Sequence, residues 1–171
     1  MPILETRTET WPDEAACAAS AAALAAHAGH AALHDAFVEL HGPLGAGKTT
    51  FARHLLRALG VTGPVKSPTY AVLEPYEVAI GGAPVALSHF DFYRFDDPQE
   101  WEDAGFREVF AAPGLKLAEW PEKAEGLLPE ADLQIHIEPL AGDARRVRYT
   151  AHTACGVALI EPAAHRAPIR P

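Results

Sequence analysis

Hydrophobic and polar residues alternate in the segment Ala36–His41, as they do in a strand with one buried face. In the segment Thr49–Leu59, apolar residues instead recur at helical spacing, and Gly60 follows as a stop signal. The apolar positions of this second segment are Phe51, Leu55, Leu56 and Leu59. The chain therefore predicts a strand and then a helix, joined by a short glycine-rich connection.

Similar patterns predict further elements on both sides of this unit. Residues 2–7 are expected to form a short strand, and residues 14–27 an alanine-rich helix capped by Asp13. The later elements expected are a strand over 70–80 broken by Pro75, a Gly81-Gly82 turn, a strand over 84–90, a helix from Asp97-Pro98 to about Ala104, a strand over 115–119, a helix whose first turn contains Pro121, and strands over 133–138 and 145–153. Together they predict an α/β fold, a three-layer sandwich with helices on both faces of a mixed parallel and antiparallel sheet.

The connection between the first strand and helix matches the phosphate-loop pattern G-x-x-x-x-G-K-[ST] at every fixed position. Its residues are Gly42, Pro43, Leu44, Gly45, Ala46, Gly47, Lys48 and Thr49, with Thr50 next in the helix. In such a loop, backbone N–H groups and the helix N-terminus bind polyphosphate, the lysine reaches the terminal phosphates, and the hydroxyl holds Mg²⁺. The flanking strand and helix are the context that the motif requires, so a P-loop NTPase-like fold is expected.

Two carboxylates are positioned to complete such a site. Asp91 follows the apolar stretch that ends at Phe90, and Glu119 follows the stretch that starts at Leu115. Phosphate-loop enzymes need acidic groups at strand ends for the metal and the attacking water. Each residue has three possible roles, which are direct metal binding, metal binding through water, and polarisation of a nucleophilic water. The alternative for each is a solvated carboxylate at a strand end.

Other polar residues permit two interpretations each. The segment Val65–Thr69 is either a switch, in which Ser67 and Thr69 sense the terminal phosphate, or an ordinary Ser-Pro turn. Arg94 is either a group that neutralises transition-state charge or a member of a surface salt bridge. Trp120 either covers the nucleotide base or belongs to the core.

Histidine, arginine and cysteine residues elsewhere favour structural interpretations. His27, His30 and His34 offer no evident fourth metal ligand, so a metal site there is not expected. His89 is expected to be structural or to line the site. The arginines at 145, 146 and 148 form either a partner-docking cluster or, by default, a solvated strand face. Cys17 and Cys155 are expected to be small buried hydrophobic residues.

Composition narrows the class of protein. The 171 residues are 49% hydrophobic and 22% charged, as in an ordinary globule, and predict one domain over residues 1–161. The proline-containing residues 162–171 are expected to fray. A net charge of −9 disfavours direct nucleic-acid binding, DNA included. No apolar run approaches 18 residues and the N-terminal segment is acidic, so a cytoplasmic protein without membrane contact is expected.

The identity of the nucleotide follows from a missing residue type. The chain contains no asparagine, so the N-K-x-D element that reads guanine in GTPases is absent. ATP, together with Mg²⁺, is therefore the expected cofactor.

Taken in chain order, these motifs resemble those of the bacterial TsaE family, small P-loop ATPases required for making threonylcarbamoyladenosine on tRNA. The matching segments are Gly42–Phe51 for the phosphate loop, Val65–Tyr70 for the switch, His89–Arg94 for an H-x-D-x-Y-R element, Asp97–Gly105 for the next helix, Leu117–Glu122 for an E-W-P element, and Leu127–Pro129 with the strands that follow. The resemblance spans about residues 10–155. One departure is Pro43, where the family commonly has an acidic residue.

The resemblance implies roles for individual residues. Thr49 and Glu119 would bind Mg²⁺, and Lys48 would bind the phosphates. Thr69 would report on the γ-phosphate, and Asp91 would serve the metal or the water. Lys48, Asp91, Glu119 and Thr69 are therefore the expected catalytic residues, with Thr49, Glu119 and Asp91 as candidate metal ligands.

The resemblance also implies a ligand neighbourhood and partners. Asp13 or Glu14, at the start of the first helix, would lie near the nucleotide base. The implied partners are the TsaD and TsaB proteins, which carry the transferase chemistry and bind tRNA, so that tRNA contact would be indirect. Two other functions remain open on this scaffold, a small-molecule kinase and a nucleotide-dependent binding module without useful hydrolysis; Pro43 motivates the latter.

Overall fold

The computed structural model describes residues 2–28, 34–65 and 72–161, and in this part of the chain seven strands form one sheet in the order β1-β7-β6-β2-β5-β4-β3. The strands are β1 (Glu5–Trp11), β2 (Phe37–His41), β3 (Leu73–Ile80), β4 (Ala83–Asp91), β5 (Leu115–Glu119), β6 (Leu133–Pro139) and β7 (Arg145–Ala151). The helices are α1 (Glu14–Ala28), α2 (Lys48–Leu59), α3 (Pro98–Asp103), α4 (Phe106–Ala111) and α5 (Ala154–Leu159), with a 3-10 helix η2 (Pro121–Ala124).

The sheet is mixed, as the sequence predicts. Strand β2 lies between β5 and β6 and runs parallel to both, and β4 is parallel to β5. The two sides are closed by antiparallel pairs, β3 with β4 on one side and β6 with β7 and β7 with β1 on the other. The carboxyl ends of β2, β4 and β5 therefore meet at one edge of the sheet, where ligands of α/β proteins bind.

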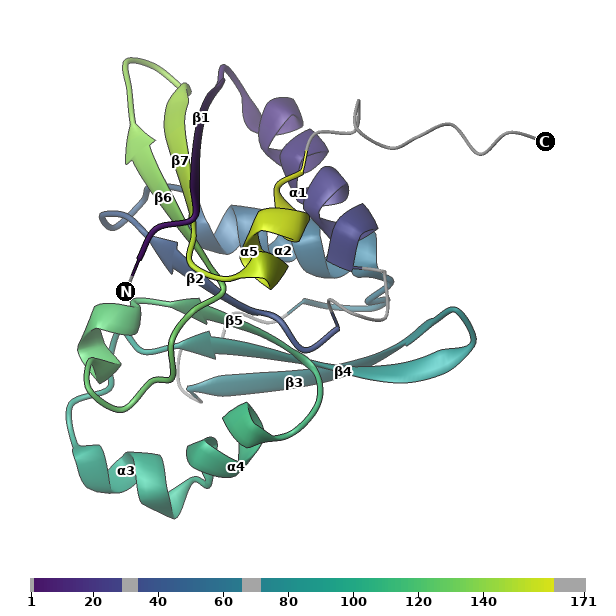
Figure 1. Ribbon diagram of the computed structural model, residues 1–171. Coiled ribbons are helices and arrows are strands. Elements are labelled where there is room, and N and C mark those ends of the chain that lie inside the picture. The colour runs from purple at the N-terminus through teal and green to yellow at the C-terminus, as the bar shows by residue number, and fades with distance from the viewer. Residues whose placement is uncertain (1, 29–33, 66–71, 162–171) are drawn as a thin grey trace.

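Helices cover both faces of the sheet (Figure 1). Helices α1, α2 and α5 lie on one face, over a large apolar core that includes Phe51, Leu55 and Ile135. Helices α3 and α4 lie on the other face, over a second core of aromatic residues around Phe90 and Phe92. This arrangement confirms the expected α/β sandwich of three layers.

The helix ends follow the local sequence. Asp13 accepts a hydrogen bond from the Ala16 N–H at 3.0 Å, and Asp97 accepts one from the Gln99 N–H at 2.9 Å, so both act as N-terminal caps. Gly60 ends α2 with φ +112, a left-handed conformation that residues with a Cβ atom rarely adopt. The predicted boundaries of these helices are thus confirmed.

The first strand is displaced from its predicted position. It spans Glu5–Trp11 rather than residues 2–7, because its register against β7 pairs Glu5 with Ala151 and Trp11 with Arg145. Pro75 does not break β3, which is an edge strand and tolerates the missing N–H on its unpaired side.

Two short helices are absent from the sequence prediction. Helix α4 begins after Gly105, and α5 begins after Thr153, whose side chain accepts a hydrogen bond from the Gly156 N–H at 3.1 Å. The last strand accordingly ends at Ala151 rather than at residue 153. Each helix has only six residues, too few for a helical pattern to stand out. Downstream of Trp120, the expected helix is a single 3-10 turn.

Some expectations fall outside the described residues. These are residues 66–69 of the proposed switch, His30, and the tail 162–171. Among the described residues, Cys17 is buried, Cys155 is only partly buried, and both are free thiols. In the described ranges, no helix combines the length and apolar character needed to cross a membrane.

Candidate nucleotide-binding site

The phosphate loop connects the end of β2 to the start of α2, as its sequence predicts. Gly42 lies so close to β6 that a Cβ atom there would stand 2.5 Å from the Ile137 carbonyl oxygen. Gly47, with φ +108, turns the chain into α2, and no side chain caps that helix end. The first N–H groups of a helix have no partner inside the helix, so this end of α2 can receive an anion.

Pro43 fits this loop without visible disturbance. Its carbonyl oxygen accepts a hydrogen bond from the Ala46 N–H at 3.1 Å and closes a turn. Leu44 sits at the tip of the loop with 74% of its surface exposed. The turn therefore needs the carbonyl oxygen of Pro43 and not its N–H, so proline is compatible with it.

The Lys48 side chain is buried inside the loop. Its ammonium donates to the carbonyl oxygens of Gly42 and Pro43, and it lies 3.6 Å from the centre of the Trp120 ring. Burial lowers the pKa of this ammonium, while the carboxylates of Glu119, Glu122 and Asp91 raise it. The cation is thus held where these carboxylates offset part of its desolvation.

Thr49 and Glu119 are joined directly. The Thr49 hydroxyl donates to Glu119 Oε1 at 2.7 Å, across 70 residues of sequence. The other oxygen, Oε2, lies 2.7 Å from His89 Nε2, and the side chains of His89 and Glu119 are only 1% and 2% exposed. Glu119 is therefore a buried carboxylate with a partner on each oxygen.

Asp91 stands beside Glu119 at the ends of two parallel strands, since β4 and β5 pair these two residues in register. It is less buried than Glu119, and its Oδ1 accepts the Tyr93 N–H at 3.0 Å. Burial raises the pKa of Asp91; the bond from Tyr93 opposes this rise and the Glu119 charge adds to it. The two predicted carboxylates are adjacent, but they have different surroundings.

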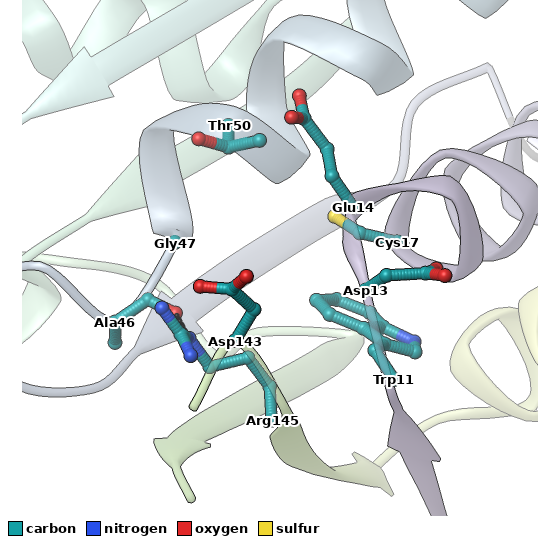
Figure 2. Close-up of a pocket in the computed structure, with 9 residues that line it drawn as sticks. All are labelled: Trp11, Asp13, Glu14, Cys17, Ala46, Gly47, Thr50, Asp143 and Arg145. Atoms are coloured by element: carbon teal, nitrogen blue, oxygen red, sulfur yellow. Dashed lines mark hydrogen bonds between the residues drawn. The ribbon is translucent and has the colours of Figure 1, made fainter. Parts of the chain in front are cut away.

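A cavity of about 320 Å³ opens on the other side of the loop (Figure 2). Three parts of the chain line it, namely the β1–α1 junction, the start of α2, and the β6–β7 connection. Its lining residues are Trp11, Asp13, Glu14, Cys17, Ala46, Gly47, Thr50, Asp143 and Arg145. The cavity is large enough for a heterocyclic base, and it contains both acidic residues that the family resemblance places there.

Three contacts hold the walls of this cavity in place. Arg145 Nε donates to the Ala46 carbonyl oxygen at 2.9 Å, which ties β7 to the phosphate loop. Glu14 lies 3.0 Å from His54 Nε2, which ties α1 to α2. Trp11 stacks on Phe51 with ring centres 5.6 Å apart, so the indole is fixed by the core.

A comparison with protein families decides the family. The family model described as "Threonylcarbamoyl adenosine biosynthesis protein TsaE" matches residues 11–147, most of the chain. The chain belongs to the TsaE family. The role named for that family is tRNA threonylcarbamoyladenosine biosynthesis, and its relatives carry the same role in their names.

Relatives and a solved structure agree with this assignment. The TsaE protein of Haemophilus influenzae is 44% identical over 123 residues, covering 72% of this chain and 75% of the relative. The TsaE protein of Bacillus subtilis is 40% identical over 112 residues, covering 66% and 67%. The crystal structure of Bacillus subtilis YdiB superposes with a TM-score of 0.71 at 26% identity, covering 93% of this chain and 94% of that one.

The structure brings most of the predicted residues of this TsaE family member into one region. Lys48, Thr49, Asp91 and Glu119 lie together on the sheet side of the loop, while Glu14 and Thr50 line the cavity. Thr69 lies outside the described residues.

Other residues correct or extend the sequence interpretation. Trp120 does not line this cavity; it packs on Lys48 and against the aromatic core. Trp11 and Asp143 line the cavity but were missed, because only the sheet register brings them near the loop. The arginine cluster divides, since Arg145 binds the loop whereas Arg146 pairs with Glu138 at 3.4 Å on the surface.

The oxygen donors beside the loop are of the type that Mg²⁺ prefers. Among the described residues, no group of three or more His, Cys, Asp or Glu side chains forms a metal site, which includes the region of His27 and His34. Mg²⁺ bound with a nucleotide needs only one or two protein oxygens, because phosphates and water supply the others. The Thr49 hydroxyl beside the Glu119 and Asp91 carboxylates is such a set of hard oxygen donors.

Proposed function

We propose that the protein is an ATP-binding, magnesium-dependent ATPase that supports threonylcarbamoyl modification of adenosine in tRNA by acting on the TsaD–TsaB complex. The observation that carries this proposal is the 2.7 Å hydrogen bond from Thr49 to Glu119, directly beside Lys48. It joins the hydroxyl of the phosphate loop to a strand-end carboxylate, the pair that phosphate-loop NTPases use around Mg²⁺.

In this proposal the loop binds and orients the phosphates. The N–H groups at the start of α2 and the Lys48 ammonium face the β- and γ-phosphates, and Thr49 with Glu119 holds Mg²⁺. Bound Mg²⁺ would supply positive charge that neutralises the negative charge developing on the phosphate oxygens during phosphoryl transfer. Asp91, half-buried and next to Glu119, accepts a hydrogen bond from the attacking water.

The cavity of Figure 2 is the proposed site of the adenine base. It adjoins the loop at Ala46 and Gly47, so a nucleotide whose phosphates lie in the loop extends into it. Its carboxylates, Asp13, Glu14 and Asp143, are acceptors suited to an exocyclic amino group such as that of adenine. This placement agrees with the role that the family resemblance implies for Glu14.

The substitution Glu119→Gln tests the proposed machinery. It keeps the size of the side chain but removes the charge, so affinity for ATP without Mg²⁺, measured by calorimetry, should change less than about threefold. ATP turnover with TsaD and TsaB should fall about 100-fold, as expected when a charged group acts mainly in the transition state. Exposed Glu125→Gln is the matched control and should change neither quantity. Equal losses of affinity and turnover in Glu119→Gln would show that Glu119 is misassigned.

The same assay separates this function from the two alternatives. Phosphate release should be slow for the isolated protein and faster with TsaD and TsaB, because a switch ATPase needs its partner to complete the site. Phosphate found on an acceptor molecule rather than in water would indicate a kinase. Continued tRNA modification without ATP consumption would indicate a binding module.

A further inference from the structure

His89 stands out as a buried group that the proposed mechanism does not use. It lies on β4, two residues before Asp91, and its side chain is 1% exposed. The alternation of β4 puts Val85, Leu87 and His89 on the face covered by α2, beneath the helix that carries Thr49. A polar ring is costly in such a place unless it makes a specific hydrogen bond.

Among the described residues, the ring makes one hydrogen bond, through one of its two nitrogens. His89 Nε2 lies 2.7 Å from Glu119 Oε2. Nδ1 is fully buried and, within the described part of the chain, has no hydrogen-bond partner. With the Glu119 oxygen as acceptor, the donor of this bond is the Nε2–H of His89.

The unpartnered nitrogen then selects the tautomer. A proton on Nδ1 would be a buried N–H donor without an acceptor, whether the ring were neutral or charged. A ring with its hydrogen on Nε2 avoids that cost and leaves on Nδ1 only a lone pair. Both oxygens of Glu119 are consequently fixed, one by His89 and one by the Thr49 hydroxyl.

The geometry points to His89 as a positioning residue whose Nε2–H, by donating to Glu119 Oε2, orients Glu119 toward Thr49 and the magnesium–nucleotide site. It acts through Glu119 and touches neither nucleotide nor water. Residues behind a metal-binding group commonly set its orientation and are worth about 10- to 100-fold in metal affinity or activity. The effect on magnesium and nucleotide binding rests on the proposed function. The hydrogen bond between His89 and Glu119 can be tested on the protein without any ligand.

The first test needs no ligand. Two-bond ¹H–¹⁵N correlation spectra of the full chain with ¹⁵N-labelled histidine report which ring nitrogen carries hydrogen, and His89→Gln identifies the His89 signals by their loss. The expected result is hydrogen on Nε2, the nitrogen that faces Glu119. Hydrogen on Nδ1 with none on Nε2 would overturn the inference.

The second test compares two replacements of the same ring. His89→Leu removes the donor but fills the space, whereas His89→Gln keeps an N–H at about the distance of Nε2. In His89→Leu, the gain in ATP affinity on adding Mg²⁺, measured by calorimetry, should fall about 10- to 100-fold, while affinity without Mg²⁺ stays within about twofold. His89→Gln should recover most of the loss. His136→Leu, a half-buried histidine on the opposite face of the sheet, is the control and should behave like the unmodified protein.

The outcomes are distinct. Unchanged magnesium dependence in His89→Leu, or equal losses in both variants, would overturn the positioning role. If His89→Leu does not fold, the spectra and His89→Gln decide, since loss of magnesium dependence in the glutamine variant would contradict the role of the donor. If the unmodified protein binds no ATP with Mg²⁺, the proposed function fails, while the tautomer measurement still tests the His89–Glu119 geometry.

Discussion

At the scale of single residues, the site depends on charges held in a largely water-free setting. Lys48 is 5% exposed and Glu119 is 1% exposed, yet Lys48 donates to carbonyl oxygens of its own loop and Glu119 accepts from Thr49, 70 residues away. Buried charges of this kind are costly when one partner is removed, because the other remains desolvated. Their substitution should therefore have effects that exposed residues of the same type do not.

The substitution Lys48→Ala should remove most of the affinity for ATP. The phosphates lose a charge-assisted hydrogen bond that contributes about 1.5 to 3 kcal/mol to binding. The dissociation constant measured by calorimetry should therefore rise roughly 10- to 100-fold. The exposed Lys123→Ala is the control, since it removes the same charge one turn from Trp120. A similar loss in both variants would attribute the effect to net charge rather than to the loop.

A second residue-scale prediction concerns a histidine outside the site. His136 on β6 stacks on His41 of β2 with ring centres 4.6 Å apart. Burial lowers the pKa of His136 from 6.5 to about 4, with His41 and Arg148 adding to the shift. The unfolded chain therefore binds a proton at pH values where folded His136 does not, and folding stability falls as pH drops from about 6.5 toward 4.

The variant His136→Gln should lose this part of the pH dependence. A full shift would be worth about 3 kcal/mol, and partial exposure of the ring reduces the expectation to about 1 to 2 kcal/mol. Urea unfolding of both proteins at pH values between 7 and 4 gives their free energies of unfolding. The contribution of His136 is the difference between the two curves of this free energy against pH. Parallel curves through this range would contradict the prediction.

At the scale of elements, packing decides features that local sequence leaves open. Helix α5 follows β7 and packs against β6 and β7. A Cβ atom on its Gly156 would stand 1.9 Å from the Asp132 carbonyl oxygen at the start of β6. Glycine is therefore required at position 156 because the helix approaches the sheet too closely for a Cβ atom, and not because the backbone there needs an unusual conformation.

The substitution Gly156→Ala should destabilise the fold by about 1 to 3 kcal/mol or more, because a methyl group must displace backbone rather than a flexible side chain. The midpoint of urea unfolding should fall while its slope stays constant. The control is Ala154→Ser on the exposed side of the same helix, which should stay within about 0.5 kcal/mol. Unchanged stability in Gly156→Ala would show that α5 can move away from β6.

At the scale of the whole molecule, the net charge of −9 limits what the surface can bind. Affinity for a nucleic-acid backbone comes largely from lysine and arginine that replace counterions. Of the arginines on β7, Arg145 is committed to the phosphate loop and Arg146 pairs with Glu138. The proposed function therefore places tRNA on the partner proteins.

The isolated protein should accordingly bind tRNA more weakly than about 10⁻⁴ M at physiological salt, the weak end of non-specific nucleic-acid binding. Anisotropy of labelled tRNA during titration with the protein, with and without ATP and Mg²⁺, measures this. Micromolar binding by the protein alone would contradict it and would indicate a basic surface that net charge conceals.

Much of the fold was accessible from the sequence, because the strongest patterns are local. The β2–loop–α2 unit follows from alternation, helical spacing and one motif, and the caps Asp13 and Asp97 mark their helices. The failures also have physical causes. Helix α5 is too short to show a helical period. The start of β1 is set by its pairing with residues 145–151 of β7, so the local sequence of β1 alone does not define it.

The sequence by itself determined which chemical groups the site contains, since the loop motif, Asp91 and Glu119 can be identified from the sequence alone. Only the tertiary structure decided how they are joined, with Thr49 and His89 on the two oxygens of Glu119, and Trp11, Asp143 and Arg145 around one cavity. The reason is that hydrogen bonds and cavities form between residues that are distant in the chain. Their pairing is fixed by sheet order and register, which no local pattern encodes.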